Sequence, residues 1–216
     1  MSKPRVKICC IGSVGEARLA IDYGASALGL VSEMPSGPGV IAEDLIAQIA
    51  AIVPPAVASF LLTCRRDATS IIAQQRRCRT NTIQLCDRLE QREYAPLRAA
   101  LPGIALVQVV HVRGEEAVAE ALFVAPRVDA ILLDSGNQSL PVRELGGTGR
   151  AHDWAISARI REGIDVPLFL AGGLRAENVR EAVERVGPFG LDVCSGVRSR
   201  GQLDERKLND FFRQLD

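Results

Sequence analysis

The sequence predicts a single-domain α/β protein, a (β/α)8 TIM barrel, and three features of the chain support this prediction. Short apolar runs alternate with helical patterns throughout the 216 residues. Most runs are rich in valine, isoleucine and leucine and lack strict alternation, as expected of parallel strands covered on both faces. Glycine-bearing loops follow the last runs, where such barrels commonly bind phosphate. We therefore expect one barrel domain over residues 1–216.

Eight apolar runs are the predicted strands. Most gaps between them are about 15–25 residues long, which leaves room for one crossover helix and its loops. The runs cover residues 6–11, 27–31, 58–62, 82–86, 105–112, 130–135, 168–171 and 190–194. An open sheet of the Rossmann type is the alternative, but the first run is not followed by the G-x-G-x-x-G motif of that fold.

Capping residues and apolar stripes predict several helices between these strands. Ser13 is placed to cap the first helix, and Gly24 is placed to end it. Apolar residues recur at helical spacing in four further segments, 45–52, 118–122, 179–186 and 208–215. We expect these stripes to pack against the sheet rather than to bind a cofactor or partner.

The composition excludes several classes of protein. Lys plus Arg equals Asp plus Glu at 26 residues each, and only 4% of residues are aromatic. A nucleic-acid binder would need a basic excess or aromatic stacking platforms. No apolar run approaches the roughly 20 residues of a membrane span, and the first residues lack a signal-peptide pattern. We expect a cytoplasmic monomer or homodimer with no nucleic-acid or membrane partner.

The six cysteines show no C-x-x-C spacing and no nearby histidine pair. We therefore expect no metal site. In a reducing compartment, such a set is typical of small buried side chains or of a single reactive thiol.

Two side chains are candidate catalytic groups, because the catalytic residues of a barrel lie at the carboxyl ends of its strands. Cys9 lies near the end of the first strand, on the same face as Lys7 because side chains alternate along a strand. A lysine ammonium there would favour the thiolate, which can act as a general base or nucleophile. A buried, inert thiol is the alternative.

The second candidate, Asp134, follows four apolar residues of the sixth predicted strand. Such a carboxylate either caps the structure that follows or acts as an acid in a poorly solvated pocket. Burial would raise its pKa and suit it to donate a proton. The residues alone leave both interpretations open.

Three loops late in the chain carry glycine where backbone N–H groups could approach an anion closely. The candidate phosphate-binding residues are Gly147, Thr148, Gly149, Gly172, Gly173, Ser195 and Gly196. Ordinary strand-to-helix turns are the alternative interpretation of these glycines.

Five motifs follow one another in an informative order. They are Lys7-Ile8-Cys9, Leu133-Asp134-Ser135, Gly146-Gly147-Thr148-Gly149, Leu170-Ala171-Gly172-Gly173-Leu174 and Asp192-Val193-Cys194-Ser195-Gly196-Val197. Each is common alone, but in this combination and order they resemble the phosphoribosylanthranilate isomerase family, over nearly the whole chain.

The resemblance implies an aldose–ketose isomerase of tryptophan biosynthesis that needs no metal or organic cofactor. The family converts the phosphosugar N-(5-phosphoribosyl)anthranilate to 1-(2-carboxyphenylamino)-1-deoxyribulose 5-phosphate by an Amadori rearrangement. The resemblance makes Asp134 the general acid and Cys9 the general base. Lys7, Gln84 and Asp192 are weaker candidates for contact with the substrate.

The chain departs from the family pattern at several positions. Cys10 stands where the family has glycine, Cys86 where it has histidine, and Arg198 where it has an acidic residue. Gly39 replaces an arginine that in the family meets the anthranilate carboxylate, and Arg198 is one candidate for a substitute anion contact. A related isomerase acting on another phosphosugar amine and a non-catalytic phosphosugar-binding paralogue are therefore alternative functions.

Overall fold

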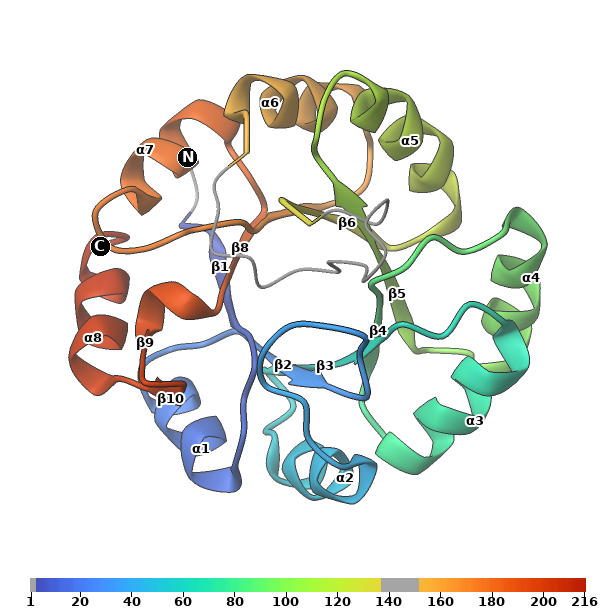
Figure 1. The fold of residues 1–216 in the computed structure, drawn as a ribbon, viewed down its shortest axis with the longest axis horizontal. Coiled ribbons are helices and arrows are strands. Elements are labelled where there is room, and N and C mark those ends of the chain that lie inside the picture. The colour runs from blue at the N-terminus through green and yellow to red at the C-terminus, as the bar shows by residue number, and fades with distance from the viewer. Residues whose placement is uncertain (1–2, 137–151) are drawn as a thin grey trace.

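Eight parallel strands form the centre of the molecule. The computed structural model describes residues 3–136 and 152–216. Within these residues the strands hydrogen-bond in chain order and close into a barrel (Figure 1). They are β1 (Arg5–Ile8), β2 (Ala27–Val31), β3 (Ala58–Thr63), β4 (Thr82–Leu85), β5 (Ala105–His111), β6 (Ala130–Asp134), β7 (Leu168–Leu170) and β8 (Gly190–Val193). The predicted fold class and all eight predicted strands are confirmed.

An outer ring of helices covers the barrel (Figure 1). In the described part of the chain these are α1 (Val14–Asp22), α2 (Glu43–Ile52), α3 (Ala68–Cys78), α4 (Gln91–Ala100), α5 (Glu116–Val124), α6 (Trp154–Gly163), α7 (Val179–Val186) and α8 (Glu205–Arg213). Two 3-10 turns, η1 (Ala125–Arg127) and η2 (Ser195–Val197), and the antiparallel pair β9 (Arg198–Ser199) and β10 (Gln202–Leu203) complete the elements.

Local sequence signals account for several of these boundaries. The Ser13 hydroxyl caps α1 by accepting a hydrogen bond from the backbone N–H of Glu16 at 3.1 Å, as predicted. Gly24 follows that helix with a φ of 96°, which glycine adopts without strain. β1 ends at Ile8, earlier than predicted, because Cys10 has a φ of 62° and is no longer extended.

Barrel closure brings together residues that are far apart in the chain. β1 pairs with both β2 and β8, and Lys7 stands in register with Asp192 of β8. On the other side of the barrel, His111 of β5 stands in register with Asp134 of β6. Registered residues of parallel strands project to the same side of the sheet, so each pair has its side chains on one face.

The apolar side chains form two cores. The larger lies between the strands and the helices and includes Ile46 and Ile49 of α2. The smaller fills the barrel interior, where the rings of Phe60 and Phe169 meet edge to face with their centroids 5.9 Å apart. Cys9 belongs to this inner core, so its side chain packs against the apolar residues of the barrel interior.

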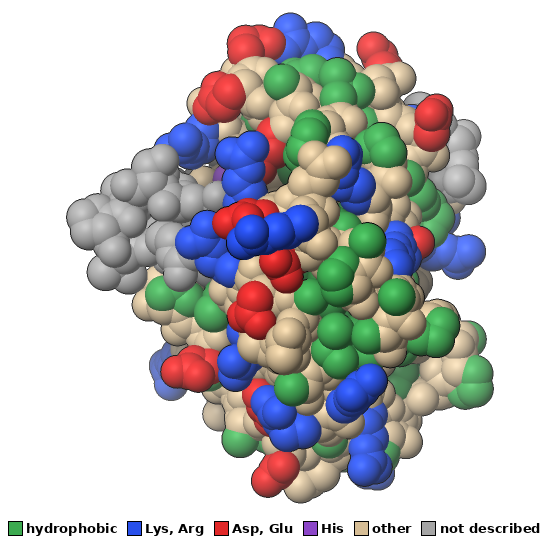
Figure 2. Space-filling model, turned by 90° about the vertical axis from the view of Figure 1, so that its right-hand side faces the viewer, with side chains coloured by type: hydrophobic (Ala, Val, Ile, Leu, Met, Phe, Trp, Pro, Cys, Tyr) green, Lys and Arg blue, Asp and Glu red, His purple; other side chains and the backbone are tan. Residues whose placement is uncertain are grey.

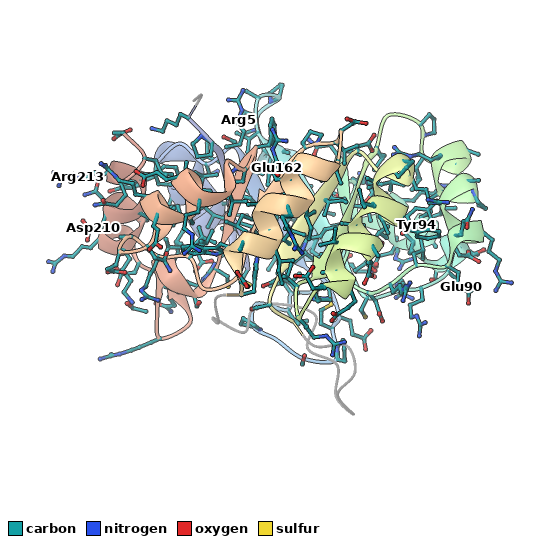
Figure 3. The ribbon with its side chains drawn as sticks, turned by 90° about the horizontal axis from the view of Figure 1, so that it is seen from above. Arg5, Glu90, Tyr94, Glu162, Asp210 and Arg213 are labelled. Carbon is teal, nitrogen blue, oxygen red and sulfur yellow. The ribbon has the colours of Figure 1, made fainter. Side chains whose placement is uncertain are left out.

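The loops that follow the strands lie at one end of the barrel. Figure 3 views the barrel from its side, with Arg5 at the start of β1 toward one end and Glu90, in the segment after β4, toward the other. The loops that follow the strands therefore open on the Glu90 side. This is the end at which catalytic residues of barrels lie.

The outer surface carries mixed charge. On the face shown in Figure 2, acidic and basic side chains are interspersed among apolar ones, in keeping with a formal net charge of zero. Among the described helices, none is both long and apolar enough to cross a membrane.

Candidate active site

A pocket opens at the carboxyl ends of the strands. Cys9 and Asp134, the two predicted catalytic residues, both line it, as do Gln84 and Asp192. The loop after β2 contributes Met34 and residues 36–38 to the wall. Among the predicted phosphate-binding residues, Gly172, Gly173 and Ser195 line the same pocket. Barrel closure thus assembles most of the predicted site residues around one space.

Lys7 lies beneath the pocket and is fully buried. Its Nζ donates a hydrogen bond to Oδ1 of Asp192 at 2.8 Å and lies 5.3 Å from the centroid of the Phe60 ring. Burial alone would lower the pKa of Lys7, but the charge of the Asp192 carboxylate and of nearby thiols outweighs it, so the pKa is raised. Lys7 is therefore a permanent cation under the site.

The Cys9 side chain points to the barrel interior together with that of Lys7, as predicted. Its backbone N–H donates to the carbonyl oxygen of Val193 at 2.8 Å, which fixes the strand end. A Cβ on Gly29 would lie 2.8 Å from Sγ of Cys9 and 3.0 Å from Nζ of Lys7. Glycine at position 29 leaves room for the Cys9 thiol and the Lys7 ammonium to lie side by side.

Asp134, at the end of β6, is 8% exposed. Burial raises the pKa of its carboxyl, and the hydrogen bond that Oδ1 accepts from the backbone N–H of Ser135 at 2.7 Å opposes this only in part. A larger fraction of this carboxyl is protonated at a given pH than of an exposed aspartate. The pocket therefore brings together a carboxyl of raised pKa and a thiol.

His111 is a neighbour of Asp134 that the sequence analysis missed. Its Nε2 lies 3.3 Å from the carbonyl oxygen of Cys86, and no described residue is a hydrogen-bond partner of its Nδ1. Burial lowers the pKa of His111, against the influence of the Asp134 charge. Alternation along β5, where Val107 and Val109 belong to the inner core, is the signal that could have placed it.

Arg198 holds the strand end that carries Cys9. Its guanidinium donates to the carbonyl oxygens of Cys9, at 3.2 Å, and of Cys10. It also forms an ion pair with Glu16 at 3.0 Å. Arg198 is buried and is not among the described residues that line the pocket. These contacts give it a structural role and argue against the substitute anion contact considered above.

The loops after β7 and β8 form one side of the pocket. Gly172 and Gly173 have φ values of 86° and 65°, where side chains are strained. A Cβ on Gly196 would collide with the carbonyl oxygen of Leu174, so glycine allows the two loops to meet. Within the described residues, no backbone acceptor is found for the N–H groups of Gly172 and Gly173. Gly147, Thr148 and Gly149 lie outside the described residues.

Neither the remaining histidine nor any arginine of the described residues lines the pocket. His152 Nε2 lies 2.8 Å from the hydroxyl of Ser157 in α6, and burial lowers the pKa of this histidine to about 4. No arginine is among the described residues that line the pocket. Groups of histidine, cysteine and carboxylate residues suited to a metal ion are likewise absent from the described residues.

The model of the family described as N-(5'-phosphoribosyl)anthranilate (PRA) isomerase matches residues 6–214. The chain belongs to this family. An N-(5'-phosphoribosyl)anthranilate isomerase from Methanosarcina acetivorans is 32% identical over 227 residues, which cover 99% of this chain and 93% of that protein. The PRA isomerase family resemblance read from the motifs is thereby confirmed.

Two solved structures of PRA isomerases share the fold over 98% of both chains. One, in complex with reduced 1-(o-carboxyphenylamino)-1-deoxyribulose 5-phosphate, is 26% identical with a TM-score of 0.81. The other, of monomers of the dimeric enzyme from Thermotoga maritima, is 25% identical with a TM-score of 0.79. The departures at Cys10, Gly39, Cys86 and Arg198 are thus set in an ordinary PRA isomerase barrel.

Proposed function

We propose that this chain catalyses the Amadori rearrangement of N-(5-phosphoribosyl)anthranilate to 1-(2-carboxyphenylamino)-1-deoxyribulose 5-phosphate in tryptophan biosynthesis. The observation that carries the proposal is the shared pocket of Cys9 and Asp134. A proton-transfer isomerisation needs a base and an acid, and the pocket offers a thiol beside an ammonium and a carboxyl whose pKa burial raises. Family membership supports the same reaction.

Asp134 is the general acid of the first step. It protonates the furanose ring oxygen, and the C1′–O bond breaks to open the sugar to a Schiff base. The raised pKa of Asp134 favours the protonated form from which this transfer starts.

Cys9 is the general base of the second step. Its thiolate removes the proton from C2′ of the Schiff base, and the electron pair moves toward the nitrogen to give an enol. The enol then tautomerises to the ketone product. The Lys7 ammonium lies buried on the same face of β1 as Cys9.

The glycine loops hold the phosphate at the other end of the substrate. Gly172, Gly173, Ser195 and Gly196 offer backbone N–H groups at the edge of the pocket, where an anion can approach closely. Gly147, Thr148 and Gly149 are proposed to complete this phosphate site. Gln84 and Asp192 are proposed to contact the sugar from the pocket wall. Lys7 does not line the pocket and is proposed to act through its hydrogen bond to Asp192.

Properties of the relatives complete the proposal. A reduced form of the proposed product is bound in a solved PRA isomerase, which supports the same ligand here. A dimeric PRA isomerase is known from Thermotoga maritima, and we expect a monomer or homodimer in the cytoplasm. The proposed reaction needs no cofactor, because both proton transfers use side chains.

Growth of a tryptophan auxotroph that lacks the isomerase tests this function. We expect rescue by the wild type and by Cys64→Ala, a control thiol in the loop after β3. We expect no rescue by Cys9→Ala or Asp134→Asn. If the wild type failed to rescue but bound ribose 5-phosphate, a different phosphosugar amine or a binding role would replace the proposal. Rescue by both site variants would refute the assigned roles.

A further inference from the structure

Two thiols from opposite ends of the chain meet at the pocket. Sγ of Cys10 lies 2.8 Å from Sγ of Cys194, although 184 positions separate them in the sequence. Both residues line the pocket, so a small molecule can reach them. A disulfide bond is about 2.05 Å long, and a movement of less than about 1 Å would therefore form one.

The surroundings distinguish the two sulfur atoms. The contact with Cys10 lowers the pKa of Cys194 against the effect of burial, and the Arg198 guanidinium acts in the same direction as the contact. The same contact, together with burial, raises the pKa of Cys10. Cys194 is partly exposed whereas Cys10 is buried, so an oxidant in the pocket meets Cys194 first and Cys10 is placed to resolve it.

We propose that Cys10 and Cys194 are a redox modification site that forms a reversible disulfide, with a hydroperoxide as the oxidant. The Cys194 thiolate attacks one peroxide oxygen, the O–O bond breaks, and hydroxide leaves, which gives a sulfenic acid. The Cys10 sulfur then attacks the Cys194 sulfur, and water leaves with the proton of Cys10. The two sulfurs lose two electrons, and the peroxide gains them.

The bond would join two parts of the proposed catalytic site. Cys10 follows Cys9, and Cys194 precedes the Ser195–Gly196 loop. Oxidation would fix these strand ends to each other and thereby lower turnover, and a dithiol would restore it. This effect on turnover rests on the proposed function, whereas formation of the bond does not.

Thiol counting and peptide mapping test the bond without reference to activity. One equivalent of hydrogen peroxide is added to the reduced protein, free thiols are alkylated, and the digest is analysed by mass spectrometry. We expect two of the six thiols to be lost, a Cys10–Cys194 cross-linked peptide, and full recovery with dithiothreitol. Loss of no thiol, or a cross-link that involves Cys9 or Cys86 instead, would overturn the proposal.

Variants separate this pair from general thiol oxidation. Cys10→Gly removes one partner and suits the φ of 62° at that position, so it should fold and lose no thiol pair. Cys64→Ser should still lose two thiols, because Cys64 is not a pocket residue in the described structure. Turnover of each protein is compared with its own reduced form. If the Cys10–Cys194 disulfide were mapped and turnover were unchanged, the proposed effect on catalysis would be wrong.

Discussion

Cys10 leaves no room for a side chain at position 39. A Cβ on Gly39 would lie 2.5 Å from Cβ of Cys10 and 2.9 Å from its Cα. Gly39 also has a φ of 80°, which strains any other residue. The sequence resemblance implies glycine at the first position and arginine at the second in the family. On that expectation, the side chain at position 10 and its absence at position 39 belong to one coupled change.

This coupling predicts a specific pattern of stabilities. Gly39→Ala should lower the free energy of unfolding by about 1–3 kcal/mol more than Gly103→Ala, because overpacking costs about that much. Gly103 is the matched control, since its φ is 82° and its Cβ would meet nothing within 4 Å. Urea unfolding of both variants and of Cys10→Gly/Gly39→Ala measures the difference. The double variant should recover part of the loss, because only the Cα of residue 10 then remains within 3.0 Å. Equal losses in both single variants would disprove the contact.

Breaking the buried ion pair of Lys7 and Asp192 should lower the free energy of unfolding strongly. Lys7→Met leaves the Asp192 carboxylate buried without its partner, which typically costs about 3–5 kcal/mol. Arg77→Met is the control, because Arg77 is half exposed and its ion pair with Glu43 lies on the surface, where such pairs are worth less than about 1 kcal/mol. Chemical denaturation compares the two. Similar losses would mean that Asp192 is solvated in the folded protein.

Asp134 should make stability depend on pH. Its pKa is raised above the ordinary value of 3.8, so the folded protein binds this proton more tightly than the unfolded chain. Stability is therefore lost as pH rises from the unfolded to the folded pKa. The Tm of Asp134→Asn relative to wild type should increase over the same range. A Tm difference independent of pH would refute the raised pKa.

Arg198 should position Cys9 without contacting the substrate. Arg198→Met releases the carbonyl oxygens of Cys9 and Cys10, and a displaced base should lower kcat about 10- to 100-fold with little change in KM. Arg185→Met, on the exposed face of α7, should leave both unchanged. Cys10→Gly in the Arg198→Met background should recover part of kcat, because glycine tolerates φ 62°. A rise in KM with normal kcat would instead indicate substrate contact.

Much of the barrel is readable from the sequence because its determinants are local. The eight apolar runs coincide with strands, and Ser13 caps α1 as its side chain predicts. Helix α3 has polar residues at both ends, Thr69-Ser70 and Gln74–Arg77, and α4 contains Pro96. Neither offers a clear apolar stripe from which the helix could be predicted.

The site is less readable because its contacts depend on closure of the barrel. Alternation places Lys7 and Cys9 on one face, but only the β1–β8 register brings Lys7 to Asp192. The ion pair of Arg198 with Glu16 and the contact of Cys10 with Cys194 join the two ends of the chain. Such contacts leave no periodic signal in a single sequence.

The central claim is that Cys9 removes the C2′ proton, and single-turnover kinetics with excess enzyme tests it most directly. N-(5-phosphoribosyl)anthranilate is mixed with wild type, Cys9→Ala or Cys64→Ala, and its conversion is followed by fluorescence. We predict that Cys9→Ala binds the substrate but converts it at least about 100-fold more slowly, the usual contribution of a general base. Conversion by Cys9→Ala within twofold of the Cys64→Ala control would contradict the account.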